Sequence, residues 1–341
     1  MARGASRRYV GTNGGRLVAA LATLSLLTAA GLAGCDREGH GNQATADSRS
    51  TATVRIGYLP ITHALSMAAA DQVLRAGSSG LRLELVRFSS WPELTDALDA
   101  GKIDGASTMI ELALVAKQQG FPLKLVALTH QEGNTLVARK GINSIVELKG
   151  MTVAIPHRMS VHNILLHLAL ARAGLRDEDV KKVEMAPPDM MAALARGEID
   201  AYIVAEPFGA AAIVHGVGAP LLRDKDIWPE SPCCGLVLRE EFIRANPTAV
   251  QELVTSVVQG GRLLQRDRTQ AEQIAQQYFG YKRDLMEQSL PWVEYGQLTP
   301  RAEEVGKLQQ YLVDLGLVKN PVKIADFMDA QYAKKAYSSL K

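Results

Sequence analysis

The chain has 341 residues and a nearly balanced charge, with 38 lysines and arginines against 36 aspartates and glutamates. Without a basic surplus or a basic run, the composition argues against a nucleic-acid partner. Three cysteines are too few for a disulfide scaffold. The chain has few aromatic residues and many small apolar ones, which is typical of an α/β protein, and it is long enough for two lobes.

Residues 1–34 have the pattern of a secretion signal. Four arginines and no acidic residue accompany an apolar run over 17–27, which is too short to span a membrane. The segment then ends in Leu-Ala-Gly-Cys at Cys35, which resembles the bacterial lipobox. This resemblance implies cleavage before Cys35, a lipid on its thiol and a membrane-anchored protein outside the cytoplasm. An ordinary signal peptide with a chance cysteine is the alternative.

Residues 35–52 are expected to form a flexible tether, because 39–52 are rich in Gly, Ser, Ala and Thr and lack an apolar pattern. Asp36 follows the modified cysteine directly and resembles the inner-membrane retention signal of some Gram-negative lipoproteins. The expected location is therefore the periplasmic face of the inner membrane. The arginine pair at Arg7 and Arg8 leaves the export route open between the general and the twin-arginine pathway.

A repeat with an offset of 96 residues predicts two lobes of like construction. Residues 53–60 and 152–156 each indicate a short strand ending in proline and followed by a helix. Residues 97–105 match 193–201, where a glycine ends a helix and an apolar strand follows. Strands that alternate with helices predict a mostly parallel sheet in each lobe, with ligands beyond the carboxyl ends of the strands.

The pattern changes after residue 231, where one strand and then a series of helices follow. Asn246 and Pro247 are typical of a helix start. The predicted organisation is lobe 1 over 53–137, lobe 2 over 138–232, and a return to lobe 1 with C-terminal helices over 233–341.

Several motifs resemble the nitrate/bicarbonate/sulfonate family of substrate-binding proteins, which serve ATP-binding-cassette (ABC) importers. They lie at 57–62, 91, 101–106, 155–166, 173–175, 186–190, 197–201 and 205–208. The resemblance covers roughly 53–265 and implies an α/β, two-lobed periplasmic-binding-protein fold of type II, with the ligand cleft between the lobes. It also implies a monomer without a cofactor that works with an ABC permease and its ATPase subunit and binds a small molecule.

The same resemblance implies which individual residues of this chain bind the ligand. The positions that it assigns to the ligand are Thr62, Trp91, Thr108, Asn134, His162 and Glu206. Helix starts at Thr62 and Ser160 would also present free backbone N–H groups to an anion or an oxygen-rich ligand; Ser160 is first of all an N-cap, but it can serve as both. His63 is a further candidate for ligand binding, although it departs from the family, because nitrate and bicarbonate binders usually carry an acid there. The ligand class therefore stays open among nitrate, bicarbonate, sulfonates and pyrimidine-type molecules.

Cys233 and Cys234 are adjacent, and a disulfide between neighbours is strained because their Cα atoms are only about 3.8 Å apart. Two buried thiols at the hinge are the main expectation. A soft-metal or sulfur contact with the ligand, helped by His130 or His157, is the sharper alternative. No metal-ligand spacing in the sequence supports it, so no metal is expected.

Two other function classes remain as alternatives. One is an enzyme like the eukaryotic pyrimidine synthases of the same family. Those enzymes carry a cysteine cluster, which Cys233 and Cys234 of this chain match only faintly. The other is an extracytoplasmic ligand sensor. The chain has no nucleophile triad, phosphate-binding loop or dinucleotide fingerprint, so an enzyme is not expected.

Overall fold

The computed structural model describes residues 52–77 and 80–340. The predicted signal peptide, the lipid site at Cys35 and the tether up to residue 51 lie outside the described residues. Within the described ranges, none of the helices combines the length and apolar character needed to cross a bilayer.

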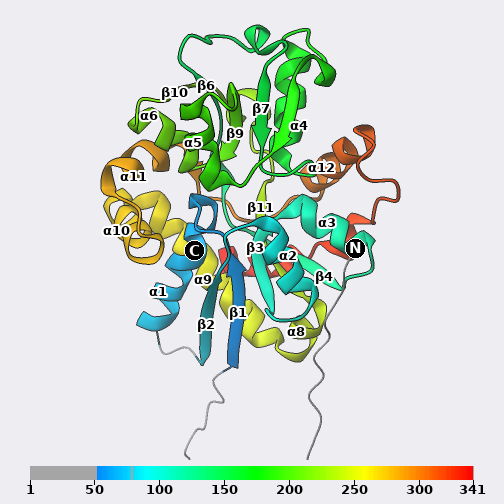
Figure 1. Cartoon of the computed structure of the whole chain (residues 1–341). Helices are drawn as coiled ribbons and strands as arrows, with labels where there is room; N and C mark the ends of the chain where they lie inside the picture. Colours follow the sequence, from blue (N-terminus) through cyan, green and yellow to red (C-terminus); the bar gives the residue numbers. More distant parts are fainter. Residues whose placement is uncertain (1–51, 78–79, 341) are drawn as a thin grey trace, which may run out of the picture. The chain divides into compact units, whose positions relative to one another are not determined.

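The first lobe is built on a five-stranded sheet in the order β2-β1-β3-β11-β4 (Figure 1). Its strands are β1 (Ala52–Tyr58), β2 (Leu81–Arg87), β3 (Gly105–Met109), β4 (Leu123–Leu128) and β11 (Cys234–Arg239). β1 pairs in parallel with β2 and β3, whereas β11 runs antiparallel to both β3 and β4.

The second lobe contains another five-stranded sheet in the order β10-β6-β9-β7-β8. Its strands are β6 (Asn134–Arg139), β7 (Thr152–Ile155), β8 (Lys181–Glu184), β9 (Ala201–Ala205) and β10 (Gly218–Arg223). β7 pairs in parallel with β8 and β9, whereas β6 is antiparallel to β9 and β10. Two further short strands, β5 (Gln131–Glu132) and β12 (Val293–Glu294), pair with each other.

In each sheet four of the five strands run in one direction and the fifth runs against them, so the prediction of mostly parallel sheets is confirmed although both sheets are mixed. The antiparallel pairings involve β6 and β11, and these are the strands by which the chain enters one sheet from the other lobe. A strand that arrives from the opposite side must run against its neighbours. The residue at which the sequence places the end of lobe 1, Val137, lies inside β6 and pairs only within the second sheet.

Helices cover the sheets of both lobes. Those that follow strands of the first lobe are α1 (Leu65–Ala76), α2 (Trp91–Asp99) and α3 (Ile110–Gln118). Those of the second lobe are α4 (Val161–Arg172), α5 (Pro187–Arg196), α6 (Phe208–Val214) and α7 (Asp224–Ile227). Short 3-10 helices span Thr62–Ala64, Ile145–Leu148, Asp177–Asp179 and Leu290–Trp292. The repeat is confirmed at Gly101 and Gly197, which both end helices with φ near 70°.

The C-terminal helices contact both lobes. They are α8 (Glu240–Ala245), α9 (Pro247–Arg266), α10 (Arg268–Phe279), α11 (Arg283–Ser289), α12 (Ala302–Asp314), α13 (Ile324–Phe327) and α14 (Gln331–Ser339). α9 packs closely along α1, whereas α11 contacts α6 and α12 contacts both α3 and α4 (Figure 1). The last third of the chain therefore connects the two lobes besides covering the first.

Candidate functional site

The candidate site lies where strand ends and helix starts from both lobes meet. From the first lobe come the 3-10 turn after β1, the end of β3 and the loop after β4. From the second lobe come the start of α4 and the segment after β9. The hydroxyl of Thr62 donates to the carbonyl of Glu206 at 2.8 Å, and the backbone N–H of Thr62 donates to the same oxygen at 2.9 Å. These two bonds join the lobes beside the site.

Four side chains at this junction form what we call the His-Cys cluster: His63, His130, Cys233 and Cys234. All four are buried, and one nitrogen or sulfur atom from each lies within 4.8 Å of the others. His63 Nδ1 lies 3.6 Å from the sulfur of Cys233 and 3.8 Å from that of Cys234, and the two sulfurs are 3.7 Å apart. Both cysteines are free thiols, as expected from the sequence.

The backbone fixes the tautomer of both histidines in the cluster. His63 Nε2 lies 2.8 Å from the carbonyl oxygen of Gly133, and His130 Nδ1 lies 2.7 Å from that of Glu132. A carbonyl oxygen only accepts, so each of these nitrogens carries the hydrogen and the other ring nitrogen has the lone pair. That lone pair of His130, on Nε2, accepts the backbone N–H of Cys234 at 3.3 Å. Burial lowers the pKa of His63 to about 3 and that of His130 well below its ordinary value, so both rings are neutral.

Three buried polar side chains around the cluster have atoms without a hydrogen-bond partner among the described residues. They are both ring nitrogens of His162, the hydroxyl of Thr108 and Oε2 of Glu111. Burial, and next the charge of His63, lower the pKa of His162 to about 3. His162 belongs to lobe 2, and the other two belong to lobe 1. Each lobe therefore brings unsatisfied polar atoms to the junction.

Buried acids give the site its electrostatic character. Burial raises the pKa of Glu111 to about 8, and it raises the pKa values of Glu206 and Asp224 to about 7. Glu111 still accepts the backbone N–H of Val161 at the start of α4. No lysine or arginine is buried anywhere in the described ranges. The site therefore contains buried acids, thiols and neutral imidazoles, and among the described residues no buried cationic side chain accompanies them.

Most residues that the sequence selects are buried at this junction, namely Thr62, His63, Thr108, His130, Asn134, Ser160, His162, Glu206, Cys233 and Cys234. Asn134 donates to Asp224 through its backbone N–H at 2.9 Å and its side chain at 2.8 Å. Trp91 and His157 instead line a separate cavity with Glu184. His157 Nδ1 there accepts the N–H of Met159, so His130, and not His157, joins the two cysteines.

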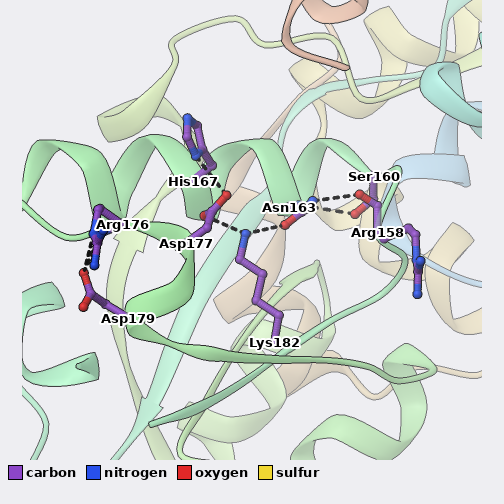
Figure 2. A network of polar contacts seen from close by, with 8 residues as sticks. All are labelled: Arg158, Ser160, Asn163, His167, Arg176, Asp177, Asp179 and Lys182. Atoms are coloured by element: carbon purple, nitrogen blue, oxygen red, sulfur yellow. Dashed lines mark hydrogen bonds and ion pairs between the residues drawn. The ribbon is translucent and has the colours of Figure 1, made fainter. Parts of the chain in front are cut away.

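A polar network on α4 supports the position of His162. Ser160 is the N-cap of this helix and accepts the N–H of Asn163, as predicted. Asn163 in turn accepts from Lys182, which also contacts Asp177 (Figure 2). The polar groups on the β8 side of the helix are thus satisfied within lobe 2, whereas the nitrogens of His162 are left unpaired in the site.

Sequence reasoning missed Glu111, Asp224 and the cluster as a whole. The cluster draws its atoms from three distant segments, after β1, after β4 and at the start of β11, so no local spacing could reveal it. Glu111 did carry a usable signal, because it is a lone acid inside the apolar run 109–116. An ionisable residue in such a run is either exposed on one face or buried for a purpose.

The family model described as the NMT1-like family matches residues 47–278 of this chain. The chain is 28% identical to the "Nitrate import ATP-binding protein NrtC" of Synechococcus elongatus over 80% of its own length, but it spans only 44% of that relative. It is 27% identical to the "Putative aliphatic sulfonates-binding protein" of Escherichia coli, with 80% of this chain and 86% of the relative covered.

Comparison with solved structures also finds binding proteins of import systems. The ligand-binding component of an ABC-type import system from Staphylococcus aureus, solved with zinc bound, is 36% identical, with a TM-score of 0.80 over 84% of this chain and 99% of that one. Periplasmic binding proteins for nitrate and aliphatic sulfonates share the fold, which confirms the predicted fold class. The desulfurization enzyme DSZB also shares the fold at 16% identity, a level that carries no inference about activity.

Proposed function

Because this chain belongs to the NMT1-like family, whose members include periplasmic binding proteins of ABC importers, we propose that it encloses a small solute between its lobes and delivers it to a permease. Proteins of this family work with an ABC permease and its ATPase. For this chain we further propose a monomer held by a lipid on Cys35 at the extracytoplasmic face of the membrane, with both lobes exposed to the surrounding solution.

The unsatisfied polar atoms of His162, Thr108 and Glu111 are the observation that carries the proposal. A buried polar group without a hydrogen-bond partner costs about 1–3 kcal/mol of stability. Both lobes contribute unsatisfied polar atoms to the same junction, and this arrangement is explained if a bound solute supplies the missing hydrogen-bond partners. The lobes would close on the solute by hinge motion, and its binding would stabilise the closed state.

The chemistry of the site narrows the solute class. The relatives point to nitrate or sulfonates, and the zinc-bound relative adds a metal ion to the candidates. Glu111, Glu206 and Asp224 repel an anion whenever they are ionised, and no buried lysine or arginine among the described residues would offset them. This arrangement favours a cation, or a neutral solute with hydrogen-bond donors, over a simple anion.

Cys233 and His63 lie close enough to resemble a nucleophile and its base, but their protonation argues against an enzyme. Burial raises the pKa of the Cys233 thiol well above its ordinary value, and it lowers that of His63 to about 3. Both groups therefore stay neutral, whereas a catalytic pair needs a thiolate stabilised by a nearby positive charge. This supports a binding role.

The test is a thermal-unfolding screen of the purified full chain with nitrate, bicarbonate, taurine, a hydroxymethylpyrimidine and zinc chloride. A solute at about 100 times its dissociation constant adds about 2.7 kcal/mol to the free energy of unfolding, which shifts the transition clearly. Small-angle scattering on the same samples should show a more compact protein with the compound that binds. If no compound shifts the transition, the proposal loses its support.

A further inference from the structure

We propose that His63, His130, Cys233 and Cys234 bind a single thiophilic d10 metal ion, Zn²⁺ or Cu⁺, and that this ion is the solute enclosed by the two lobes. The inference rests on the proposed function, because it names the class of solute for the same site. It uses the distances within the His-Cys cluster, the tautomers of its histidines, and the polar groups that surround it.

The distances match those between ligands of one ion. A tetrahedral ion with metal–sulfur bonds of about 2.3 Å and metal–nitrogen bonds of about 2.0–2.1 Å holds two sulfurs about 3.8 Å apart and a sulfur and a nitrogen about 3.6 Å apart. In the cluster the two sulfurs are 3.7 Å apart. His63 Nδ1 lies 3.6 and 3.8 Å from them. Three ligand atoms are therefore already placed around a common centre.

The hydrogen bonds of the histidines are those of metal ligands. A metal-binding histidine usually donates its other ring N–H to a carbonyl or carboxylate, which fixes the ring and directs the free lone pair at the metal. The carbonyls of Gly133 and Glu132 accept in this way from His63 and His130. The Gly133 carbonyl also accepts the backbone N–H of Glu206 at 2.9 Å, so the support of His63 is tied to lobe 2.

The fourth ligand requires a small movement. The rings of His63 and His130 stack with centroids 3.5 Å apart and planes 19° from parallel, so each lone pair lies in a plane nearly parallel to the other ring. One ion can use both lone pairs only if a ring tilts. His130 Nε2 accepts the backbone N–H of Cys234 at 3.3 Å, and the tilt would break this bond, so the new metal–nitrogen bond has to offset its loss. Zn²⁺, which prefers four ligands, needs this step, whereas Cu⁺ is satisfied by fewer.

The charges also balance for a cation. Each thiol that binds the ion loses its proton to solvent, so two thiolates neutralise Zn²⁺ completely and leave one negative charge with Cu⁺. Neither case requires a positively charged side chain, and none of the lysines or arginines in the described ranges is buried. His162, whose two ring nitrogens have no partner among the described residues, gives lobe 2 a group that can face the enclosed ion.

The experiment uses the purified full chain, reduced and stripped with a chelator. Zn²⁺ and Cu⁺ are titrated separately against a competing chelator, native mass spectrometry counts the bound ions, and Co²⁺ is the spectroscopic probe for thiolate ligation. We expect one ion per chain and thiolate–cobalt absorption. Cys233→Ser and Cys234→Ser, which keep the volume of the side chain, should each weaken binding at least 100-fold.

His157→Ala is the matched control, because it removes a neighbouring histidine outside the cluster, and it should bind as the unaltered chain does. Unchanged binding in both cysteine variants, provided that they show the thermal transition of the metal-free protein, would overturn the inference. A bound ion that neither exchanges with free metal nor makes the protein more compact would overturn its role as solute. If nitrate or taurine binds and neither metal does, the inference fails while the proposed function stands.

Discussion

At the scale of the residue, Glu206 shows how the site makes stability depend on pH. Burial raises its pKa to about 7 from an ordinary 4.5. The folded protein therefore retains a proton between these values that the unfolded chain has lost, and the free energy of unfolding falls as pH rises from about 4.5 to about 7. Below this window Glu206 contributes no pH dependence, and above it the loss is complete.

Glu206→Gln removes this titration and should flatten the pH profile. The difference between pH 5 and pH 8 should be smaller in the variant by about 2.7 kcal/mol, from the roughly 2 pKa units between pH 5 and the pKa of about 7, at 1.36 kcal/mol each. Asp224 also titrates with a raised pKa, and its charge contributes to the raised pKa of Glu206, so the comparison measures Glu206 together with its coupling to Asp224. Urea unfolding at the two pH values measures it, with the exposed Glu198→Gln as control. Equal slopes in all three proteins would contradict the assignment.

His162→Ala should separate binding from stability. The ring nitrogens of His162 bond to no other described residue, so their removal deletes unsatisfied polar atoms and should leave the melting temperature unchanged or slightly higher. Affinity for whichever screened compound binds should fall at least tenfold by calorimetry. His167→Ala lies on the same helix and bonds to Asp177 instead, so its affinity should not change. A loss of affinity in both variants would indicate a general disturbance of α4.

The sequence was a good guide to which residues lie at the site and a poor guide to how they combine. Thr62, His162 and Glu206 were found through family motifs, and the structure buries all three at the junction. The contact between His63 and the cysteines could not be found in this way. It depends on segments 170 residues apart, and local spacing says nothing about which loops meet in space.

At the scale of the element, one glycine sets the distance between α1 and α9. A Cβ at Gly260 would lie 2.8 Å from Cβ of Ala69 and 2.9 Å from the backbone nitrogen of Ala70. Since backbone atoms cannot move aside as a side chain can, Gly260→Ala should push the helices apart and cost about 1–3 kcal/mol.

Gly306→Ala is the matched control for this prediction. Gly306 also lies inside a helix, but its added Cβ would meet only Ile324, at 3.9 Å. This variant should gain up to about 1 kcal/mol from helix propensity. Urea unfolding of both variants gives the two values. A similar gain in Gly260→Ala would mean that the helices tolerate a wider spacing than the structure indicates.

Elements were more predictable than their arrangement. Periodicity located β1, β7 and α4 to within a few residues, and glycine stops located the ends of α2 and α5, since these signals are local. The direction of β6 and β11 was not local information. It follows from the route of the chain between lobes, which makes one strand of each sheet run against the other four, so the sheets are mostly parallel, as predicted, but each contains one reversed strand.

At the scale of the whole molecule, the lobes meet at a junction that contains buried polar atoms without partners among the described residues. If this chain delivers a solute to a permease, as proposed, the proposed lipid on Cys35 would keep the protein near that permease at the membrane surface. It is independent of the site, and it can be tested independently.

Cys35→Ala should release the protein from the membrane without altering its solute binding. Acyl chains bury about 0.8 kcal/mol per CH₂, and one chain anchors only marginally, whereas the two or three of a lipoprotein hold firmly. The unaltered chain should therefore remain in washed membranes until detergent is added, whereas the variant should appear in the soluble extracytoplasmic fraction. Cys233→Ala is the control, because it also removes one cysteine but should stay anchored. If the unaltered chain is soluble as well, the signal is an ordinary one; if Cys35→Ala stays in the membrane, some other group holds it there.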